Sequence, residues 1–385
     1  MKTIIIGAGP SSLMAATQAI KNGCEVVVYE KMKTAGRKFL VAGDGGFNLT
    51  HDGSLDDFIA YYSHPQIANT IRQFTNVDLI TWLNELGIET YIGSSGKIFP
   101  AKEIKPAMVL NTWLKYLKDQ GVKFIFNATL DDFSSDEVLI KTKVGVEKHQ
   151  FDHLILGLGA ASWPKTGSDA TWASLFKQKN IEVVPFQASN AGVNCALPSE
   201  FLKEFQGSVF KNVLVSHTGT HRKGEVVLTK YGIEGSPIYY LNPSIRMNFS
   251  LPIFIDFKPD FSENELIEFL KNCKNTTEGL KKLKLPIPFI YWCKSYLTKE
   301  EFISNEQIIK LIKSFPIQPI SFRPMEEAIS CCGGVSWDEL DENLRLIKYP
   351  KISIAGEMID WEAPTGGYLL QACFATGFVA ANPVS

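Results

Sequence analysis

Thr3-Ile-Ile-Ile-Gly7-Ala-Gly-Pro-Ser-Ser12 begins the stretch that decides the fold, which continues to Val26-Val-Val-Tyr-Glu30. An apolar run, a glycine turn, a helical pattern and a second apolar run are typical of a β-α-β unit. Gly7 permits a tight turn, Gly9 lets the backbone approach a pyrophosphate, and the helix then directs its N-terminal amides at that anion. Glu30 follows at the offset of a carboxylate that binds a ribose hydroxyl. The stretch therefore predicts a dinucleotide site.

Ser12 occupies the third glycine position of G-x-G-x-x-G. Glycine at that position allows close packing of helix and strand, and a hydroxymethyl group is larger. The fingerprint is therefore imperfect, and a glycine-rich turn without a nucleotide is the alternative. The motif also leaves open which dinucleotide is bound.

Composition is that of a globular protein, with 45% apolar and 21% charged residues among 385. This length predicts about two to three domains. The net charge of -2 gives no global attraction to nucleic acid or anionic membrane, although local basic patches stay open. No apolar stretch approaches the ~20 residues of a membrane span, and the opening run is too short for a signal peptide. We therefore expect a cytoplasmic protein without a membrane partner.

Cysteine and histidine patterns predict no metal site. The seven cysteines include no C-x-x-C pair, which favours free thiols in a reducing compartment. Cys331 and Cys332 lie in 328–335, which reads as a buried turn, so we interpret them as structural, with thiol redox chemistry as the alternative. His217 and His221 are four residues apart, but the intervening Thr-Gly-Thr predicts a strand or turn rather than one helix face.

Five segments describe the expected organisation. Residues 1–189 alternate strands and helices, 190–258 and 318–347 are β-rich, 259–317 is helical in pattern, and 348–385 returns to the first segment as a strand, a loop and a helix. Helices are expected over 65–86, 105–120 and 368–381, and a hairpin over 91–100. Strands are expected over 122–126, 138–144, 154–158, 209–217, 225–229, 253–257 and 352–357.

Motifs spread along the chain resemble one known family. They are Gly36-Arg-Lys-Phe-Leu40, Gly43-x-Gly-Gly-x-Asn48, Ala161-Ser-Trp-Pro164, Gly224-Glu225, Tyr231-Gly-Ile-Glu-Gly235, Gly333-Gly-Val335 and the block from Gly356 to Gln371. In this order they resemble the YhiN/BaiN-like flavoproteins, also called aminoacetone oxidase family FAD-binding enzymes or NAD(P)/FAD-dependent oxidoreductases. Gly46 and Phe47 stand where better-known members carry Arg-Cys, so no catalytic role of that pair transfers to this chain.

The resemblance implies an α/β fold: a Rossmann-like FAD-binding domain formed by both chain ends, with an inserted β-barrel-like domain and a helical insert. It also implies non-covalent FAD. By matching position, the turn lies at the pyrophosphate, Glu30 at the ribose, Arg37 or Lys38 at the outer ribose or phosphates, and Leu130 at adenine, while Gly159 and the C-terminal residues line the ribityl and flavin. The expected FAD contacts are Gly7, Ala8, Gly9, Pro10, Ser11, Ser12, Glu30, Lys31, Arg37, Lys38, Gly43, Asn48, Leu130, Gly159, Gly356, Glu357, Gly366, Gly367, Tyr368 and Leu369.

The expected activity is an FAD-dependent oxidoreduction that transfers a hydride equivalent between flavin and an unidentified small organic substrate. NAD(P)H is a candidate reductant that would bind transiently, because no second G-x-G-x-x-G follows. Candidate acids or bases are His51, Lys230, Tyr231, Glu234 and Arg246, each of which could instead be structural.

Two other functional classes stay open. One is an FAD-dependent RNA-modifying enzyme, against which the net charge and the lack of an aromatic-basic motif argue, so a nucleic-acid partner is not expected. The other is a non-catalytic flavin or nucleotide sensor that presents its helical insert to a partner. Substrate identity, direction of reaction and oligomeric state are not encoded in these motifs.

Overall fold

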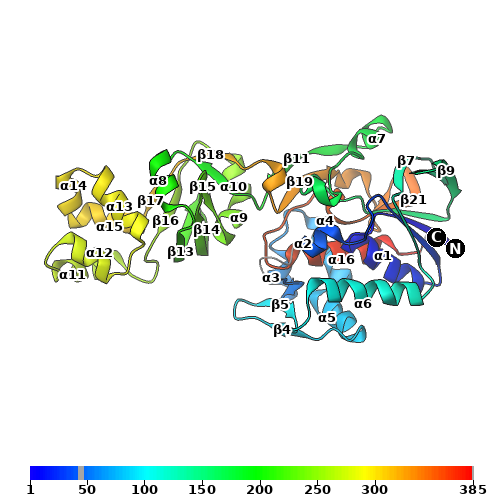
Figure 1. The fold of residues 1–385 in the computed structure, drawn as a ribbon, viewed down its shortest axis with the longest axis horizontal. Helices are drawn as coiled ribbons and strands as arrows, with labels where there is room; N and C mark the ends of the chain where they lie inside the picture. The colour runs from blue at the N-terminus through cyan, green and yellow to red at the C-terminus, as the bar shows by residue number, and fades with distance from the viewer. Residues whose placement is uncertain (42–46, 384–385) are drawn as a thin grey trace. The chain divides into compact units, whose positions relative to one another are not determined.

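The computed structural model describes residues 1–41 and 47–383. The chain divides into two compact units (Figure 1). Unit 1 comprises Met1–Ala188 and Met325–Ser385, and unit 2 comprises Ser189–Pro324. The expected second β-rich segment, 318–347, is therefore divided between the units after residue 324.

A six-stranded sheet forms the centre of unit 1 in the order β20-β21-β10-β1-β2-β6. Its strands are β1 (Lys2–Ile6), β2 (Glu25–Glu30), β6 (Lys123–Phe126), β10 (His153–Leu156), β20 (Arg345–Leu346) and β21 (Tyr349–Ile354). The pairings among β6, β2, β1, β10 and β21 are parallel, and β20 is antiparallel to β21. The α/β fold with a Rossmann-like sheet built from both chain ends is confirmed.

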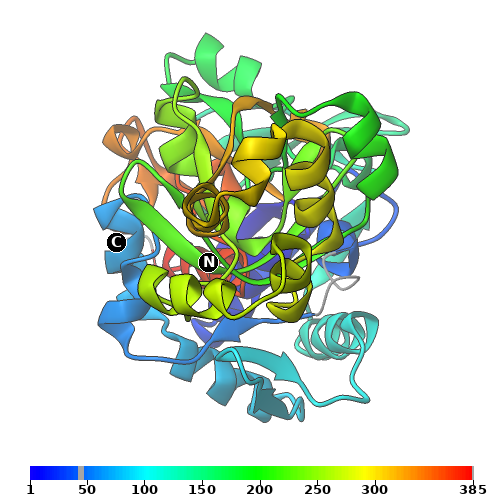
Figure 2. The same ribbon diagram turned by 90° about the vertical axis from the view of Figure 1, so that its left-hand side faces the viewer.

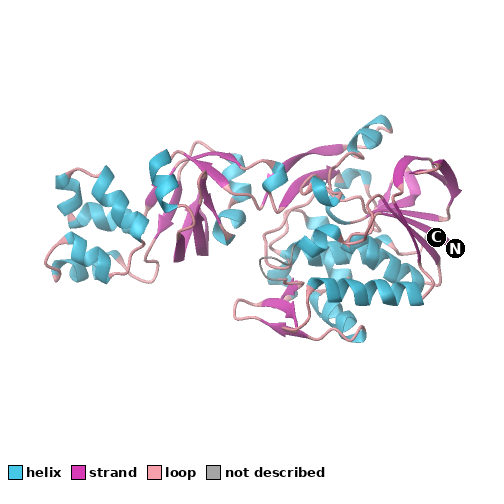
Figure 3. Cartoon of the chain, in the orientation of Figure 1, coloured by secondary structure: helices cyan, strands magenta, loops and turns pink. Residues whose placement is uncertain are grey.

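The helices of unit 1, cyan in Figure 3, bury apolar residues in the same core cluster as this sheet. They are α1 (Pro10–Lys21), α2 (Arg37–Val41), α3 (Leu55–Ile59), α4 (Pro65–Gln73), α5 (Asn76–Glu85), α6 (Pro106–Asp119), α7 (Ala173–Gln178) and α16 (Tyr368–Ala380). The expected helix over 65–86 is interrupted at Phe74, because Thr75 caps a new helix in a capping box with Asp78. Helix α1 packs so closely on α16 that a Cβ at Gly377 would collide with the Ser11 carbonyl oxygen.

Three smaller sheets complete unit 1. They are β3-β5-β4 (Thr50–His51, Lys97–Pro100, Thr90–Ile92), β7-β8-β9 (Thr129–Phe133, Glu137–Thr142, Gly145–Gln150) and β11-β19 (Val183–Ser189, Ser330–Val335). The expected buried turn at 328–335 is wrong, because Ser330–Val335 forms strand β19 beside β11. Tertiary pairing here overrides the turn preference of Gly333 and Gly334, both of which have positive φ.

A seven-stranded sheet forms the core of unit 2 in the order β17-β16-β13-β14-β15-β12-β18. Its strands are β12 (Val193–Cys195), β13 (Val209–His217), β14 (Thr220–Leu228), β15 (Gly232–Glu234), β16 (Ile253–Asp256), β17 (Phe315–Ile317) and β18 (Pro319–Phe322), with helices α8 (Ser199–Phe205), α9 (Ser236–Tyr240) and α10 (Asn242–Met247). Only Gln318 separates the two edge strands β17 and β18, so the two edges of the sheet approach each other there.

Five helices occupy the chain between β16 and β17 and lie together in both ribbon views (Figures 1 and 2). They are α11 (Glu263–Lys271), α12 (Thr276–Lys282), α13 (Ile287–Tyr296), α14 (Lys299–Ile303) and α15 (Asn305–Lys313). Leu266, Leu280, Phe289 and Ile312 join the same buried cluster as the sheet residues. Within the described residues, no helix is both long and apolar enough to cross a membrane.

Candidate functional site

A cavity of about 420 Å³ lies in unit 1 at the carboxyl ends of β1, β2 and β10. This edge of a parallel sheet is where ligands bind in doubly wound folds. Twelve residues expected from the sequence line it: Gly7, Ala8, Gly9, Pro10, Ser11, Glu30, Lys31, Arg37, Lys38, Leu130, Gly159 and Glu357. The chain thus brings the N-terminal turn and one residue of the C-terminal block to one cavity.

The glycine turn presents bare backbone to this cavity. Gly7 has φ of +102°, and a Cβ there would collide with the Gly157 carbonyl oxygen. Gly9 caps α1 without a side-chain hydrogen bond, and no described atom lies within 4 Å of the position that a Cβ would take at Gly9. An uncapped helix start beside open space suits an anion, because the first-turn amides and the helix dipole both favour negative charge.

Ser12 is fully buried and does not line the cavity. Its Oγ lies 3.4 Å from the Gly157 carbonyl oxygen, to which it donates, and a Cβ at Gly157 would collide with this Oγ. The helix and the end of β10 therefore approach closely because a glycine, Gly157, directly follows β10 opposite Ser12.

Glu30 is held by two backbone amides. Its Oε2 accepts a hydrogen bond from Ala8 N at 2.7 Å, and its Oε1 accepts one from Met32 N at 2.7 Å. Burial raises the pKa of the Glu30 carboxyl above its ordinary value, against the opposing effect of these amides. The Ala8 amide is thus directed at Glu30, while the carboxylate lines the cavity and keeps further lone pairs for hydroxyl donors.

Three cationic side chains line the cavity, and they differ in their ion-pair and hydrogen-bond partners. Lys31 Nζ pairs with Asp169 Oδ1 at 2.8 Å. Lys38 Nζ pairs with Glu357 Oε2 at 2.6 Å and donates to Ser162 Oγ at 2.9 Å. Arg37 Nε is buried without a hydrogen-bond partner among the described residues. Of the three, Arg37 offers an unused donor to an anionic ligand.

The remaining expected contacts lie outside this cavity lining. Gly356 N donates to Thr376 Oγ1 at 2.9 Å, and Gly366 and Gly367, both with positive φ, precede α16, which starts without a side-chain cap. Tyr368 is 3% exposed and its ring packs on His51, Phe58, Tyr61 and Tyr62. Asn48 and Leu369 also lie outside the lining, and Gly43 lies outside the described residues.

The five candidate acids and bases lie in different units. His51 is in unit 1, where its ring stacks on Tyr368 and its nitrogens lie 2.6 Å from Asp52 O and 3.0 Å from Ser95 O. Lys230, Tyr231, Glu234 and Arg246 are in unit 2. Lys230 is exposed, and the Arg246 guanidinium carbon lies 5.8 Å from the centre of the Phe322 ring.

Tyr231 and Glu234 form a hydrogen-bonded pair in unit 2. Tyr231 Oη donates to Glu234 Oε2 at 2.5 Å, and the Arg323 guanidinium carbon lies 4.3 Å from the centre of the Tyr231 ring. Burial and the Glu234 charge raise the pKa of the Tyr231 hydroxyl. This phenol is therefore a weaker acid than an ordinary tyrosine side chain.

Several cavity residues were missed in the sequence. Gly157 and Leu158 could have been predicted to line the site, because Gly157-Leu-Gly159 directly follows a buried strand. Residues 166–168 and the α7 region, including Trp172, Leu175 and Gln178, carry no motif and reach the cavity through the fold of the 159–172 loop.

One family sequence model, described as "HI0933-like protein Rossmann domain", matches residues 1–383. The chain belongs to this family. The resemblance to YhiN/BaiN-like flavoproteins is thereby confirmed, and the family is one of FAD-dependent oxidoreductases.

Two curated relatives match nearly end to end. The chain is 24% identical to a 3-dehydro-bile acid delta(4,6)-reductase of Clostridium scindens, with 98% of this chain and 97% of the relative covered. It is 23% identical to a ribosomal RNA dihydrouridine synthase of Haemophilus influenzae, with 100% and 98% covered. A solved 3-ketosteroid-delta4-(5alpha)-dehydrogenase from Rhodococcus jostii is 12% identical at a TM-score of 0.54, over 99% of this chain and 96% of that one, and supports the fold.

Proposed function

We propose that this chain is an FAD-dependent reductase that adds a hydride and a proton across a carbon–carbon double bond conjugated with a carbonyl group. The observation that carries the FAD assignment is the uncapped start of α1, open above Gly9 and flanked by Glu30 and Arg37 in one cavity. Bound FAD would supply two-electron hydride chemistry at its isoalloxazine ring.

The proposed FAD contacts follow the cavity lining, except for Gly366–Leu369, which lie outside it and are proposed from the family resemblance. The Gly9–Ser11 backbone and the Arg37 side chain would bind the pyrophosphate, Glu30 the adenosine ribose, and the Leu130 backbone the adenine. Glu357 and Gly159 would lie toward the ribityl chain, and Gly366–Leu369 at the flavin ring. The Glu30 carboxylate would also reject a 2′-phosphorylated nucleotide here, because two anions would be brought together.

The substrate class rests on what the two relatives' names share. A 3-dehydro bile acid with delta(4,6) unsaturation has double bonds conjugated with its 3-oxo group. Dihydrouridine arises when the C5–C6 double bond of uridine, conjugated with the C4 carbonyl, is reduced. In both reactions a hydride would add to the end of the reduced double bond that lies farther from the carbonyl and a proton to a carbon nearer to it, so one chemistry suits both substrates.

Tyr231 is the proton donor that we propose for this step. Its phenol carries the proton that the α-carbon would accept, and the resulting phenolate would be reprotonated by water; Glu234, which accepts the phenol's hydrogen bond, orients the hydroxyl. NADH or NADPH is the proposed reductant of the flavin.

Two substrates of this class are candidates: a small conjugated ketone, and uridine within RNA. The second gains support from the charge of unit 2, where Lys and Arg number 17 and Asp and Glu 13.

The first test is the visible spectrum of the purified protein, followed by anaerobic mixing with NADH and NADPH. We expect a flavin spectrum that bleaches with one nucleotide and returns with a 3-oxo-4,6-diene steroid or with unmodified ribosomal RNA. The FAD assignment is wrong if no flavin band is present and none forms after reconstitution. A flavin that no nucleotide or substrate changes would favour the sensor class.

A further inference from the structure

Charge is distributed unevenly between the two units. Unit 2 holds 17 of the 39 Lys and Arg residues but 13 of the 41 Asp and Glu residues, so it is net positive while the whole chain is net -2. The net charge of the whole chain gives no attraction to nucleic acid, but the net positive charge of unit 2 does. Electrostatic attraction to phosphate is set by local charge within about one Debye length, ~8 Å at physiological salt.

The positive charge is concentrated in residues 271–299, which contain seven lysines and one acidic residue, Glu278. Lys271 and Lys282 pair with Glu268 and Glu278. The other five are exposed and have no carboxylate within ion-pair distance in the described part of the chain: Lys274, Lys281, Lys284, Lys294 and Lys299.

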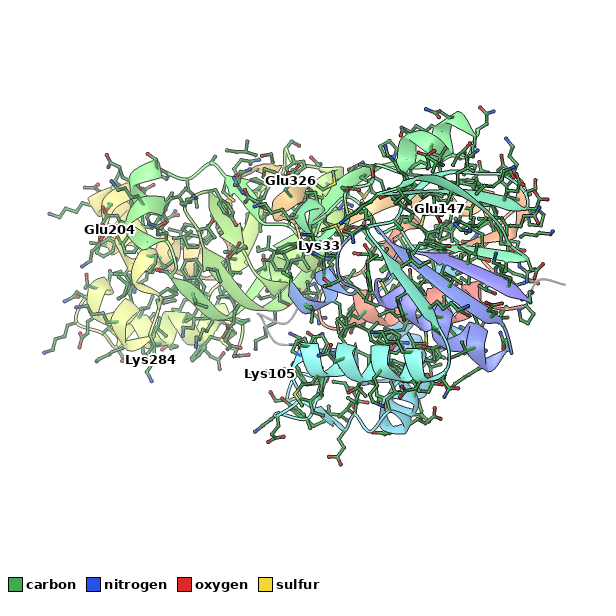
Figure 4. All side chains as sticks on the ribbon, turned by 45° about the vertical axis from the view of Figure 1, so that its right-hand side comes forward. Lys33, Lys105, Glu147, Glu204, Lys284 and Glu326 are labelled. Atoms are coloured by element: carbon green, nitrogen blue, oxygen red, sulfur yellow. The ribbon has the colours of Figure 1, made fainter. Side chains whose placement is uncertain are left out.

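Lys284 adds a like charge to this region. It lies between α12 and α13 with φ of +52°, and its side chain is labelled in Figure 4. Burial and the nearby Lys284 charge lower the pKa of Lys258, although Asp260 acts in the opposite direction. Two ammonium groups thus lie near each other and add to the local positive potential.

Helix α13 presents apolar and aromatic groups beside these lysines. Ile287, Tyr291 and Lys294 follow the i, i+4, i+7 spacing of one helix face, and Ile287 and Tyr291 are 74% and 43% exposed. The Tyr291 ring packs edge-on against Phe205, with ring centroids 4.9 Å apart, and stays partly exposed. A partly exposed aromatic ring next to unpaired cations matches a surface that binds RNA through base stacking and phosphate contacts.

We propose that the surface formed by Lys281, Lys284, Ile287, Tyr291 and Lys294, here called the α12–α13 surface, docks structured RNA. This rests on the proposed function, since uridine in RNA is one of its two candidate substrates. The lysines contact phosphates and Tyr291 contacts an unpaired base. The surface therefore selects a polyanionic substrate without taking part in hydride transfer.

The test measures binding of a fluorescein-labelled, uridine-containing RNA hairpin at roughly 50 to 200 mM KCl. Lys281→Gln/Lys284→Gln/Lys294→Gln is compared with Lys118→Gln/Lys141→Gln/Lys143→Gln, which removes three exposed, unpaired lysines of unit 1. Losing three phosphate contacts should reduce the slope of log affinity against log salt by about 2 to 3. We expect at least ~10-fold weaker binding for the first variant and unchanged binding for the control.

Lysine acetylation of the wild-type protein, with and without the hairpin, gives a second measurement that needs no variant. Protection of Lys281, Lys284 and Lys294, but not of Lys118, is expected. The proposal is overturned by no RNA binding at the lowest salt, by equal losses in both triple variants, or by binding to phosphatidylserine vesicles in place of RNA. Flavin reduction and steroid turnover by the α12–α13 variant separate these outcomes from failure of the proposed function.

Discussion

Ser12 and Gly157 face each other across the contact between α1 and the end of β10, with Ser12 Oγ donating to the Gly157 carbonyl oxygen at 3.4 Å. A Cβ at position 157 would collide with that hydroxyl. Gly157→Ala should therefore destabilise unit 1 by ~1–3 kcal/mol, as overpacking does. Ser12→Ala, the control, should change the urea midpoint less, because it keeps helix propensity and removes only the hydroxyl and its hydrogen bond of 3.4 Å. Equal midpoints for wild type and Gly157→Ala would contradict this packing.

Glu30→Gln should weaken FAD binding by about 10-fold or more, because a neutral amide is a poorer acceptor for ribose hydroxyls than a carboxylate. Since burial raises the pKa of Glu30 above 4.5, protonation in the wild type begins at higher pH than for an ordinary glutamate. FAD dissociation should accelerate as pH falls through this raised pKa, and Glu30→Gln should abolish that dependence. Fluorescence of released FAD measures both effects. An unchanged pH profile in the variant would remove Glu30 from the ribose.

Lys31 and Asp169 join the end of β2 to the loop 159–172, and both of these segments line the cavity. Lys31→Met and Asp169→Asn should each speed FAD dissociation by about 2- to 5-fold, since a partly exposed pair contributes ~0.2–1 kcal/mol. The double variant should be no faster than either single variant. Additive effects would show that the pair does not act as one clamp.

Tyr231→Phe should slow reoxidation of reduced flavin by substrate by about 100-fold, within the range of general-acid catalysis. Flavin reduction by NAD(P)H should stay at the wild-type rate, because that half-reaction needs no proton from Tyr231. Glu234→Gln, which keeps a hydrogen-bond acceptor, should slow the same step less. Stopped-flow absorbance separates the two half-reactions, and equal slowing of both would indicate a structural role for Tyr231.

His153 predicts acid sensitivity of the central sheet. Burial, with a smaller effect of Arg345, lowers its pKa from 6.5 to about 4, and its Nε2 lies 2.8 Å from Ser353 Oγ. The unfolded chain therefore binds a proton that the folded chain does not bind between these values. Stability should fall by up to ~3 kcal/mol as pH falls from 6.5 to about 4, and His153→Gln should remove this part of the slope. Urea denaturation across this range is the measurement.

The sequence predicted the helices and strands of unit 1 well where the positions of glycines and the spacing of apolar residues indicate the same element. The Gly7 turn, β10 and α16 follow their expected ranges closely, because their buried strands and helix starts have local signals. Cavity residues in the 159–172 loop and α7 could not be found in this way, because tertiary contacts bring them to the ligand edge.

The sequence also does not indicate which charged side chains form ion pairs with each other. Nothing near Lys38 in the sequence indicates that its ammonium pairs with Glu357, 319 positions away. Strand β19 could not be predicted either, because its glycines favour a turn locally and only the pairing with β11 makes this segment a strand. The net charge of the whole chain also concealed the basic region of unit 2, because the acidic excess of unit 1 cancels it.

The pairing of β10 with both β1 and β21 has a consequence for synthesis on the ribosome. Unit 2 is one continuous segment, so all of its residues are present once residue 324 has emerged. The edge of β10 and the face of α1 that α16 covers stay exposed until residues 349–380 are made. The proposed cofactor site is therefore completed last, and a ribosome that stalls within unit 2 would release a chain with an open, aggregation-prone sheet.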